Sequence, residues 1–317
     1  MTIQILKRKF VDLETCSKVR VSGHFEIFKN CEGQAPQKVA EFDNLFLNSG
    51  LNLLGTHASF TYCQVGTGNS TPAVGQVALD NFLKSQMRTN AAYTAGNDDN
   101  GDPYAQVSVT YAFPLGAVVG TISEIGISFE VPPAVLYSRA LIVDMNGNPT
   151  TITLLATEYL TIIYSFRIFP PLADYSGTVS ISGTNYNYTS RALNVTSPNS
   201  SVWTINQGIN SPFGIGTVYP YADMASLAAV TANTPNGRNI GGSSISLDAY
   251  VNNSYTNVSR ALFNQNQAND ANMISGFQLT GGSVASGCTF QMIVNPVIPK
   301  NSDRTLQVVF SVSWARK

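Results

Sequence analysis

The strongest signal in the sequence is an alternation of apolar and polar residues with a period of two. In residues 159–169 the side chains of Leu160, Ile162 and Tyr164 fall on one face, and residues 305–317 repeat the pattern. Successive side chains of a strand point to opposite faces, so this alternation predicts strands with one buried face. Further strands are predicted at residues 19–28, 60–65, 107–113, 122–129, 179–181, 245–250 and 290–294.

Helical periodicity is scarce by comparison. Residues 43–55 carry leucines at helical spacing, start with Asp43 as an N-cap and stop at Gly55, and residues 77–87 form a second short candidate. The chain is therefore expected to be all-β, with two β-sandwich-like domains of antiparallel strands and one or two short helices. The prolines that follow Phe169 end a long strand, because proline cannot donate to a ladder. They place the boundary between an N-terminal sandwich of residues 1–172, which holds both helices, and a C-terminal sandwich of residues 173–317.

The tetrapeptide Ser-Arg-Ala-Leu occurs three times, starting at Ser138, Ser190 and Ser259. In a strand its serine and alanine share one face while arginine and leucine share the other, which argues against a repeated ligand site. The first and third copies follow an Ile-rich strand and precede an Asn-rich turn and a long closing strand. This order predicts equivalent strands of two duplicated domains, with Arg139 and Arg260 at sheet edges or subunit contacts. The second copy lacks that context and is interpreted as a coincidence.

The amino-acid composition limits the kinds of molecule that the chain is expected to bind. Charged residues make up only 12% of the chain and the net charge is −1, so no basic footprint for nucleic acid is present. Short uncharged polar residues are cheaper to bury against a neighbouring subunit than Lys or Glu, which favours membership of an assembly. No signal peptide and no run of 18 apolar residues is visible, so membrane insertion is not expected. The four cysteines are too scattered for a disulfide framework or zinc site, and free thiols are favoured over a Cys16–Cys31 bond.

No pattern that carries catalysis or binds a cofactor is found. The two histidines, His24 and His57, have no Cys, Asp or second His at ligand spacing, so no catalytic residue, cofactor or metal is predicted. Asp98, Asn100 and Asp102 alternate like the oxygen ligands of a calcium loop. Pro103 and Val109 replace the glycine and glutamate that such a loop needs, so a solvated hairpin tip is the favoured interpretation and calcium the alternative.

Aromatic residues concentrate in the second half of the chain. Trp203, Tyr186 and Tyr188 are candidates for stacking on a host surface glycan. Tyrosines of β proteins also cover sandwich ends and subunit contacts, and this remains the alternative.

Several segments resemble virion structural proteins of tailed bacteriophages. The helix candidate at residues 45–55 precedes a strand that ends in Val-Gly-Thr-Gly at Gly68, and a Glu-Ile-Gly strand at Glu124 follows. Farther on, the sequence Tyr-Ser-Arg-Ala at Tyr137 precedes Glu-x-Leu-x-Ile-x-Tyr at Glu158. The resemblance covers roughly residues 42–193 and implies an accessory β-sandwich protein of the tail, baseplate, neck or head. It also implies a role in determining the fold for Gly66, Gly68, Glu124, Gly126, Ser138, Arg139 and Glu158.

These observations together predict a non-enzymatic, oligomeric structural component of the virion, assembled in the host cytoplasm and most readily placed in the tail, baseplate or neck. Its expected partners are copies of itself and other virion proteins. One alternative is a receptor- or carbohydrate-binding module of a tail appendage, and another is a capsid decoration protein. A glycan hydrolase is disfavoured, since the strands offer few inward acids from which to pair two carboxylates, with Glu124, Glu130 and Glu158 as the candidates in the first half. Oligomer order and position in the particle stay open.

Overall fold

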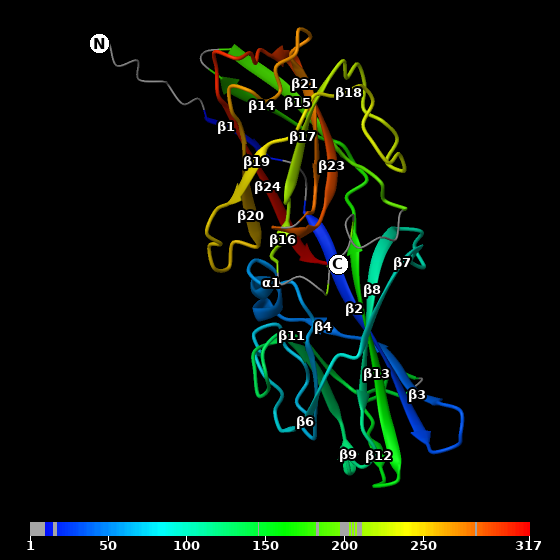
Figure 1. The fold of residues 1–317 in the computed structure, drawn as a ribbon. Coiled ribbons are helices and arrows are strands. Elements are labelled where there is room, and N and C mark those ends of the chain that lie inside the picture. Colours follow the sequence, from blue (N-terminus) through cyan, green and yellow to red (C-terminus); the bar gives the residue numbers. More distant parts are fainter. Residues whose placement is uncertain are drawn as a thin grey trace.

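The computed structural model is built almost entirely of strands (Figure 1). The residues that it describes are 10–14, 18–144, 146–181, 184–196, 203, 205, 207, 211–282 and 284–317. They contain one α-helix, α1 (Asn48–Leu54), which is too short to cross a membrane, and no other described segment is a candidate membrane-spanning helix. The expected all-β, sandwich-like fold is confirmed.

The largest sheet has nine strands and runs through both halves of the chain. Its order is β19-β20-β24-β2-β13-β8-β7, with β1 beside β24 and β3 beside β2. The strands are β1 (Phe10–Glu14), β2 (Val19–Cys31), β3 (Gln37–Asp43), β7 (Asn90–Asn97), β8 (Pro103–Phe113), β13 (Glu158–Phe169), β19 (Ser244–Leu247), β20 (Thr256–Phe263) and β24 (Leu306–Arg316). Neighbours are antiparallel except that β1 and β2 both run parallel to β24.

A five-stranded sheet covers one face of the N-terminal part of the large sheet. Its order is β4-β11-β10-β5-β6, and the pair β9–β12 lies beside it. The bounds are β4 (Leu45–Phe46), β5 (Tyr62–Gly66), β6 (Phe82–Met87), β9 (Gly120–Ile122), β10 (Glu124–Ser128), β11 (Leu136–Leu141) and β12 (Ile152–Leu154). Phe166 of β13 packs between Phe60 and Phe46, with ring centroids 4.8 and 5.7 Å away, and so joins the two layers.

A six-stranded sheet covers the C-terminal part in the same way. Its order is β14-β15-β23-β21-β17-β18, and a short parallel pair, β16–β22, lies nearby. The bounds are β14 (Tyr175–Ile181), β15 (Thr184–Ala192), β16 (Phe213–Gly214), β17 (Thr217–Ala222), β18 (Arg238–Asn239), β21 (Ile274–Thr280), β22 (Ser286–Gly287) and β23 (Thr289–Ile298). Phe277 of β21 lies 5.4 Å from Phe310 of β24 and 6.1 Å from Phe263 of β20, which joins these layers.

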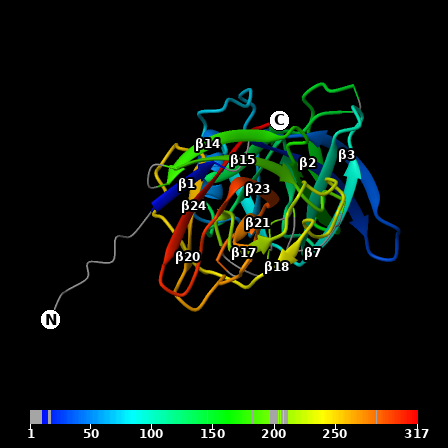
Figure 2. The same cartoon turned by 90° about the horizontal axis from the view of Figure 1, so that it is seen from above.

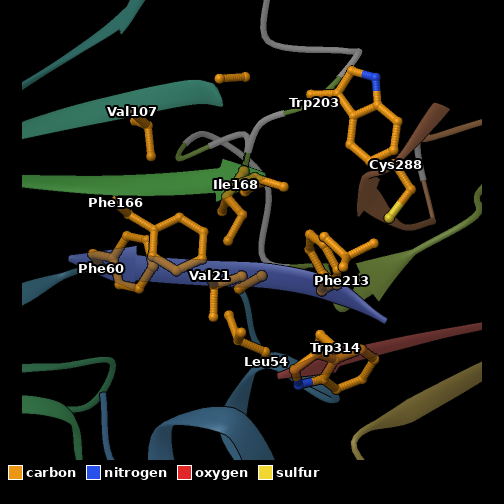
Figure 3. Packing of buried hydrophobic residues seen from close by; sticks show 14 of the residues in the cluster. Val21, Leu54, Phe60, Val107, Phe166, Ile168, Trp203, Phe213, Cys288 and Trp314 are labelled. Atoms are coloured by element: carbon orange, nitrogen blue, oxygen red, sulfur yellow. The ribbon is translucent and has the colours of Figure 1, made fainter. Parts of the chain in front are cut away.

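The two halves share a sheet and a hydrophobic core. Val19–Val21 of β2 pair with Trp314–Arg316 of β24, where the blue and red strands meet at the middle of the molecule (Figures 1 and 2). Trp314 is fully buried, and its indole N–H donates to the carbonyl of Leu51 in α1 at 2.8 Å. One cluster of buried side chains extends from Phe60 to Trp203 (Figure 3). The division at residue 172 stays a prediction, and any such units would be joined by this shared core.

The helix predictions need correction. Residues 82–87 are not helical but form the edge strand β6, because their backbone pairs with β5. The first helix begins at Asn48 rather than at Asp43, which lies in β3 and binds His24 instead of capping. Pairing with a neighbouring strand overrode weak helical spacing in both segments.

Candidate functional site

The connection between β5 and β6 is the most unusual segment of the N-terminal half. The two strands are hydrogen-bonded neighbours, yet residues 67–81, which we call the strap, separate them where a hairpin loop needs about 2–5 residues. The carbonyl of Val74 accepts a hydrogen bond from the backbone of Asn48 in α1, and that of Val77 accepts one from Leu136 in β11, both at 2.9 Å. The strap therefore crosses the face of the five-stranded sheet that points away from β13.

Arg139 of β11 fastens the strap from below. Its guanidinium donates to Glu124 of β10 at 3.0 Å and to three strap residues: Gln76 at 2.7 Å, Asp80 at 2.8 Å and Ser70 at 3.2 Å. The side chains of Arg139 and Glu124 are both fully buried, whereas Asp80 is partly exposed. A buried guanidinium with two carboxylate partners is satisfied only while the strap is in place.

Glu124 binds the ends of the strap through backbone groups. Its carboxylate accepts hydrogen bonds from the backbone N–H groups of Gly68 and Asn81 at 2.8 Å and of Asp80 at 3.0 Å. A β-carbon at Gly68 would lie 2.3 Å from the carboxylate of Glu124, and one at Gly66 would lie 2.7 Å from it. These two glycines are thus required by the close approach of the strap to the buried acid.

The charged side chains of this cluster, which we call the strap clamp, hold the strap on the sheet. The Ser70 hydroxyl and backbone N–H, together with the Arg139 guanidinium, hold the pKa of Asp80 below its usual range. Both carboxylates accept several hydrogen bonds from the strap and from Arg139. The chemistry of the cluster is to hold a loop on a sheet.

This cluster contains most of the residues on which the phage resemblance rests. Gly66, Gly68, Glu124 and Arg139 meet beneath the strap, and a β-carbon on Gly126 would come within 2.8 Å of Leu136. Glu158 is the exception, since it pairs with Lys29 at 3.0 Å and accepts the backbone N–H of Leu155 far from the strap. The glutamate and arginine could be singled out from the sequence, but nothing in it indicated that Ser70, Gln76 and Asp80 would bind them.

Apolar residues line the strap on both of its sides. Leu79 packs inward against Leu47 and Leu136 in a small cluster separate from the main core. Outward, a cavity of about 380 Å³, which we call the apolar groove, lies between the strap, β6 and the loop before β11. Its walls are formed by Gln64, Val77, Ala78, Leu79, Phe82, Glu130, Pro133, Ala134 and Val135. Val77 and Val135 are about half exposed there (53% and 48%), as an uncovered contact surface would be.

The calcium candidates are bound to the protein's own cations. Asp98 accepts the backbone N–H groups of Asn100 and Asp102 at 3.0 and 2.8 Å and pairs with Lys317, while Asp102 pairs with Arg20 at 2.9 Å. No group of three or more His, Cys, Asp or Glu side chains that could hold a metal ion exists among the described residues. The hairpin tip thus clasps Lys317, and the calcium alternative stays a prediction.

The proposed glycan platform is corrected, because its aromatic side chains are buried. Trp203 is fully buried in the hydrophobic cluster (Figure 3). Its indole N–H donates to the carbonyl of Leu193 at 2.7 Å, and its ring packs edge-on against Phe290. Tyr186 and Tyr188 lie on the buried side of β15 and are 5% and 6% exposed. Aromatic rings that fill the space between two sheets cannot stack on a sugar.

The first and third Ser-Arg-Ala-Leu copies, at Ser138 and Ser259, lie in different structural settings. Arg139 is fully buried and cannot contact another subunit, which corrects that prediction. Arg260 is partly exposed and pairs with Asp248, so its role in a subunit contact stays a prediction. β20 pairs directly with the closing strand β24, whereas β11 lies in the sheet opposite the closing strand β13. The two copies are therefore not equivalent, and the duplication hypothesis is wrong.

The histidines and cysteines form no reactive site in the part of the chain that the structure describes. His24 lies between Asp43 and Glu41 on an exposed strand face, and His57 stacks on Phe129. Cys31 and Cys63 are free thiols, and Cys16 lies outside the described residues.

Comparisons with known proteins yield no relative from which a function could be transferred. No protein-family model, no curated protein and no solved structure matches the chain.

Proposed function

We propose that this chain is a non-enzymatic structural component of a tailed-phage virion, assembled as an oligomer in the tail, baseplate or neck. The observation that carries the proposal is the strap clamp. Most of the residues in which the chain resembles phage virion proteins meet around Glu124 and Arg139, where they hold a loop on a sheet. Such residues determine a fold and a surface rather than a reaction.

The clamp gives the proposed assembly surface its shape. Because Arg139 and Glu124 fix the strap at both ends and in the middle, the outward side chain of Val77 is held in place before any partner arrives. A surface ordered beforehand loses less conformational entropy on association. The low charge of the chain suits repeated contacts between copies.

The partner that the proposal assigns to the apolar groove is another virion subunit, either a second copy or a neighbouring protein. Val77, Phe82 and Val135 would lose their remaining exposure in that contact. Burial of such side chains stabilises an interface by roughly 25 cal/mol per Å² of apolar surface before ordering costs are subtracted.

Mass spectrometry of purified phage particles tests the proposal directly. The chain should be found in washed particles at a fixed, multiple copy number per virion. Its absence from particles, with the protein present in the infected cell, would contradict the proposal.

A matched pair of variants then tests the surface. Val77→Asp should abolish incorporation into particles or oligomer formation, measured by multi-angle light scattering. Val251→Asp is the control, because Val251 is 68% exposed in the other half of the chain and away from the groove. Equal effects of the two substitutions would argue against the groove.

A further inference from the structure

A second cavity lies where the chain crosses from the five-stranded sheet to the nine-stranded sheet. It measures about 330 Å³ and lies between the start of β7 and Gln207. Its walls are formed by Arg88, Thr89, Asn90, Ala91, Tyr93 and Gln207. This volume is within the range of small-ligand sites and suits a ligand of about one sugar ring.

The backbone around the cavity is well anchored. The N–H of Arg88 donates to the carbonyl of Thr61 at 2.9 Å, and that of Thr89 donates to the carbonyl of Thr110 at 2.8 Å. Gln207 is 3% exposed, accepts the backbone N–H of Phe60 at 2.8 Å and donates its own backbone N–H to the hydroxyl of Tyr93 at 3.2 Å. The cavity walls are thus fixed by contacts from three distant parts of the chain.

Among the described residues of the cavity wall Arg88 alone is charged, and no described residue neutralises its charge. One of its terminal nitrogens donates to the Gln207 side-chain oxygen at 3.1 Å, and no described carboxylate lies within ion-pair distance. By contrast, Arg20, Arg139 and Arg260 each pair with at least one acid. A guanidinium carries five N–H donors in a fork that fits two oxygens of one carboxylate or phosphate. Most of this fork remains for a ligand.

The other walls add groups that suit a sugar. Thr89 and Asn90 are exposed and supply a hydroxyl and an amide beside the guanidinium. Tyr93 is half-buried: part of its ring packs against the hydrophobic core, and its hydroxyl accepts the backbone N–H of Gln207. The part of the ring left exposed offers an apolar surface to a sugar face. Gln207 is itself buried, and its side-chain oxygen orients the Arg88 guanidinium at the wall.

We propose that this cavity binds an acidic sugar unit, with Arg88 holding its carboxylate or phosphate group and Tyr93 packing against its ring. The inference concerns a site distant from the strap and does not depend on the virion role. The ligand would be a unit of the kind found in acidic surface polysaccharides. The cavity, rather than the buried Trp203 cluster, would be the sugar-binding site.

Titration calorimetry on the full chain tests the site with three probes: glucuronate, glucose 6-phosphate and glucose. At least one acidic sugar should bind and glucose should not, and the tighter of the two acids identifies the group that Arg88 recognises. Binding of glucose as tight as that of the acids would overturn the proposal, and so would an absence of binding by both acids.

Variants separate recognition from folding. Arg88→Gln should weaken binding of the acidic sugar by at least about tenfold, because it removes the charge and the two-pronged contact. Arg304→Gln, which removes an exposed arginine outside the cavity, should leave binding unchanged. Asn90→Asp places a negative charge on an exposed position of the wall and should also weaken binding without disturbing the core. Unchanged binding in both Arg88→Gln and Asn90→Asp, with thermal midpoints like that of the parent chain, would refute the proposal.

Discussion

Two copies of one tetrapeptide, at Ser138 and at Ser259, show how differently the same residues behave in two regions of this molecule. In both copies the serine is buried, and in both the arginine binds an aspartate. Arg139, however, lies under the strap and is fully buried, while the Arg260 side chain is 36% exposed. Strand periodicity decides which residues face the core. Whether another segment covers the opposite face decides how much the arginine contributes to the free energy of unfolding.

The largest expected effect follows from removing the covered arginine. Arg139→Ala leaves the carboxylate of Glu124 buried without a cation, and losing one partner of a buried pair costs about 3–5 kcal/mol of unfolding free energy. Denaturant unfolding monitored by tryptophan fluorescence measures the loss. A loss no greater than that of Arg260→Ala would show that the strap does not seal the pair.

The close approach of the strap predicts the next largest effect. Gly68→Ala would place a β-carbon 2.3 Å from the Glu124 carboxylate, and overpacking of this kind costs about 1–3 kcal/mol of unfolding free energy. Gly75→Ala is a matched control in the same strap, since a β-carbon there would meet nothing within 4 Å. Denaturation of both variants under the same conditions should separate them. Equal losses would mean that the tight fit at Gly68 is relieved by movement of the strap.

Much of this comparison could be predicted from the sequence, because it depends on local periodicity. Alternation correctly predicted the long strands β13 and β24. It also identified a chain made almost wholly of strands. Each of these properties depends on residues close together in the chain.

The path of the strap and the burial of Trp203 could not be predicted, because they depend on contacts between residues that are far apart in the sequence. Glu124 and Asn81 meet only after the strap has crossed the sheet, so the pattern of residues 77–87 could be taken for a helix. In the same way Trp203 lies in no regular strand, and its burial follows from the packing of Phe290 above it. Periodicity carries no information about which loop will cover which face.

Lowering the pH tests the aspartates that bind the two arginines, Asp80 beside Arg139 and Asp248 beside Arg260. Hydrogen bonds from Ser70 and Arg139 lower the pKa of Asp80, and a hydrogen bond from Arg260 lowers that of Asp248. A carboxyl group whose pKa is lower in the folded than in the unfolded protein stabilises the fold at pH values above its unfolded-state pKa. That stabilisation is lost as the pH falls through the folded-state pKa. Unfolding free energies of the parent chain and of Asp80→Asn should therefore differ at pH 7, and the difference should shrink as the pH falls below the ordinary aspartate pKa of about 3.9. A constant difference across this range would exclude ionised Asp80 as a fastener of the strap.

The smallest expected effect belongs to the exposed copy. Arg260→Ala removes a two-pronged contact with Asp248, but both side chains are about one-third exposed, so water replaces the lost partner. Measured pairs of this kind contribute roughly 0.2–1 kcal/mol to the free energy of unfolding. Added salt should reduce this small difference further, since the pair is open to screening, while the loss caused by Arg139→Ala should change little. Denaturation of both variants at low and high salt makes the measurement. If Arg260→Ala proved as costly as Arg139→Ala and equally insensitive to salt, a covering partner that closes over β20 would have to be present, as the strap is over β11.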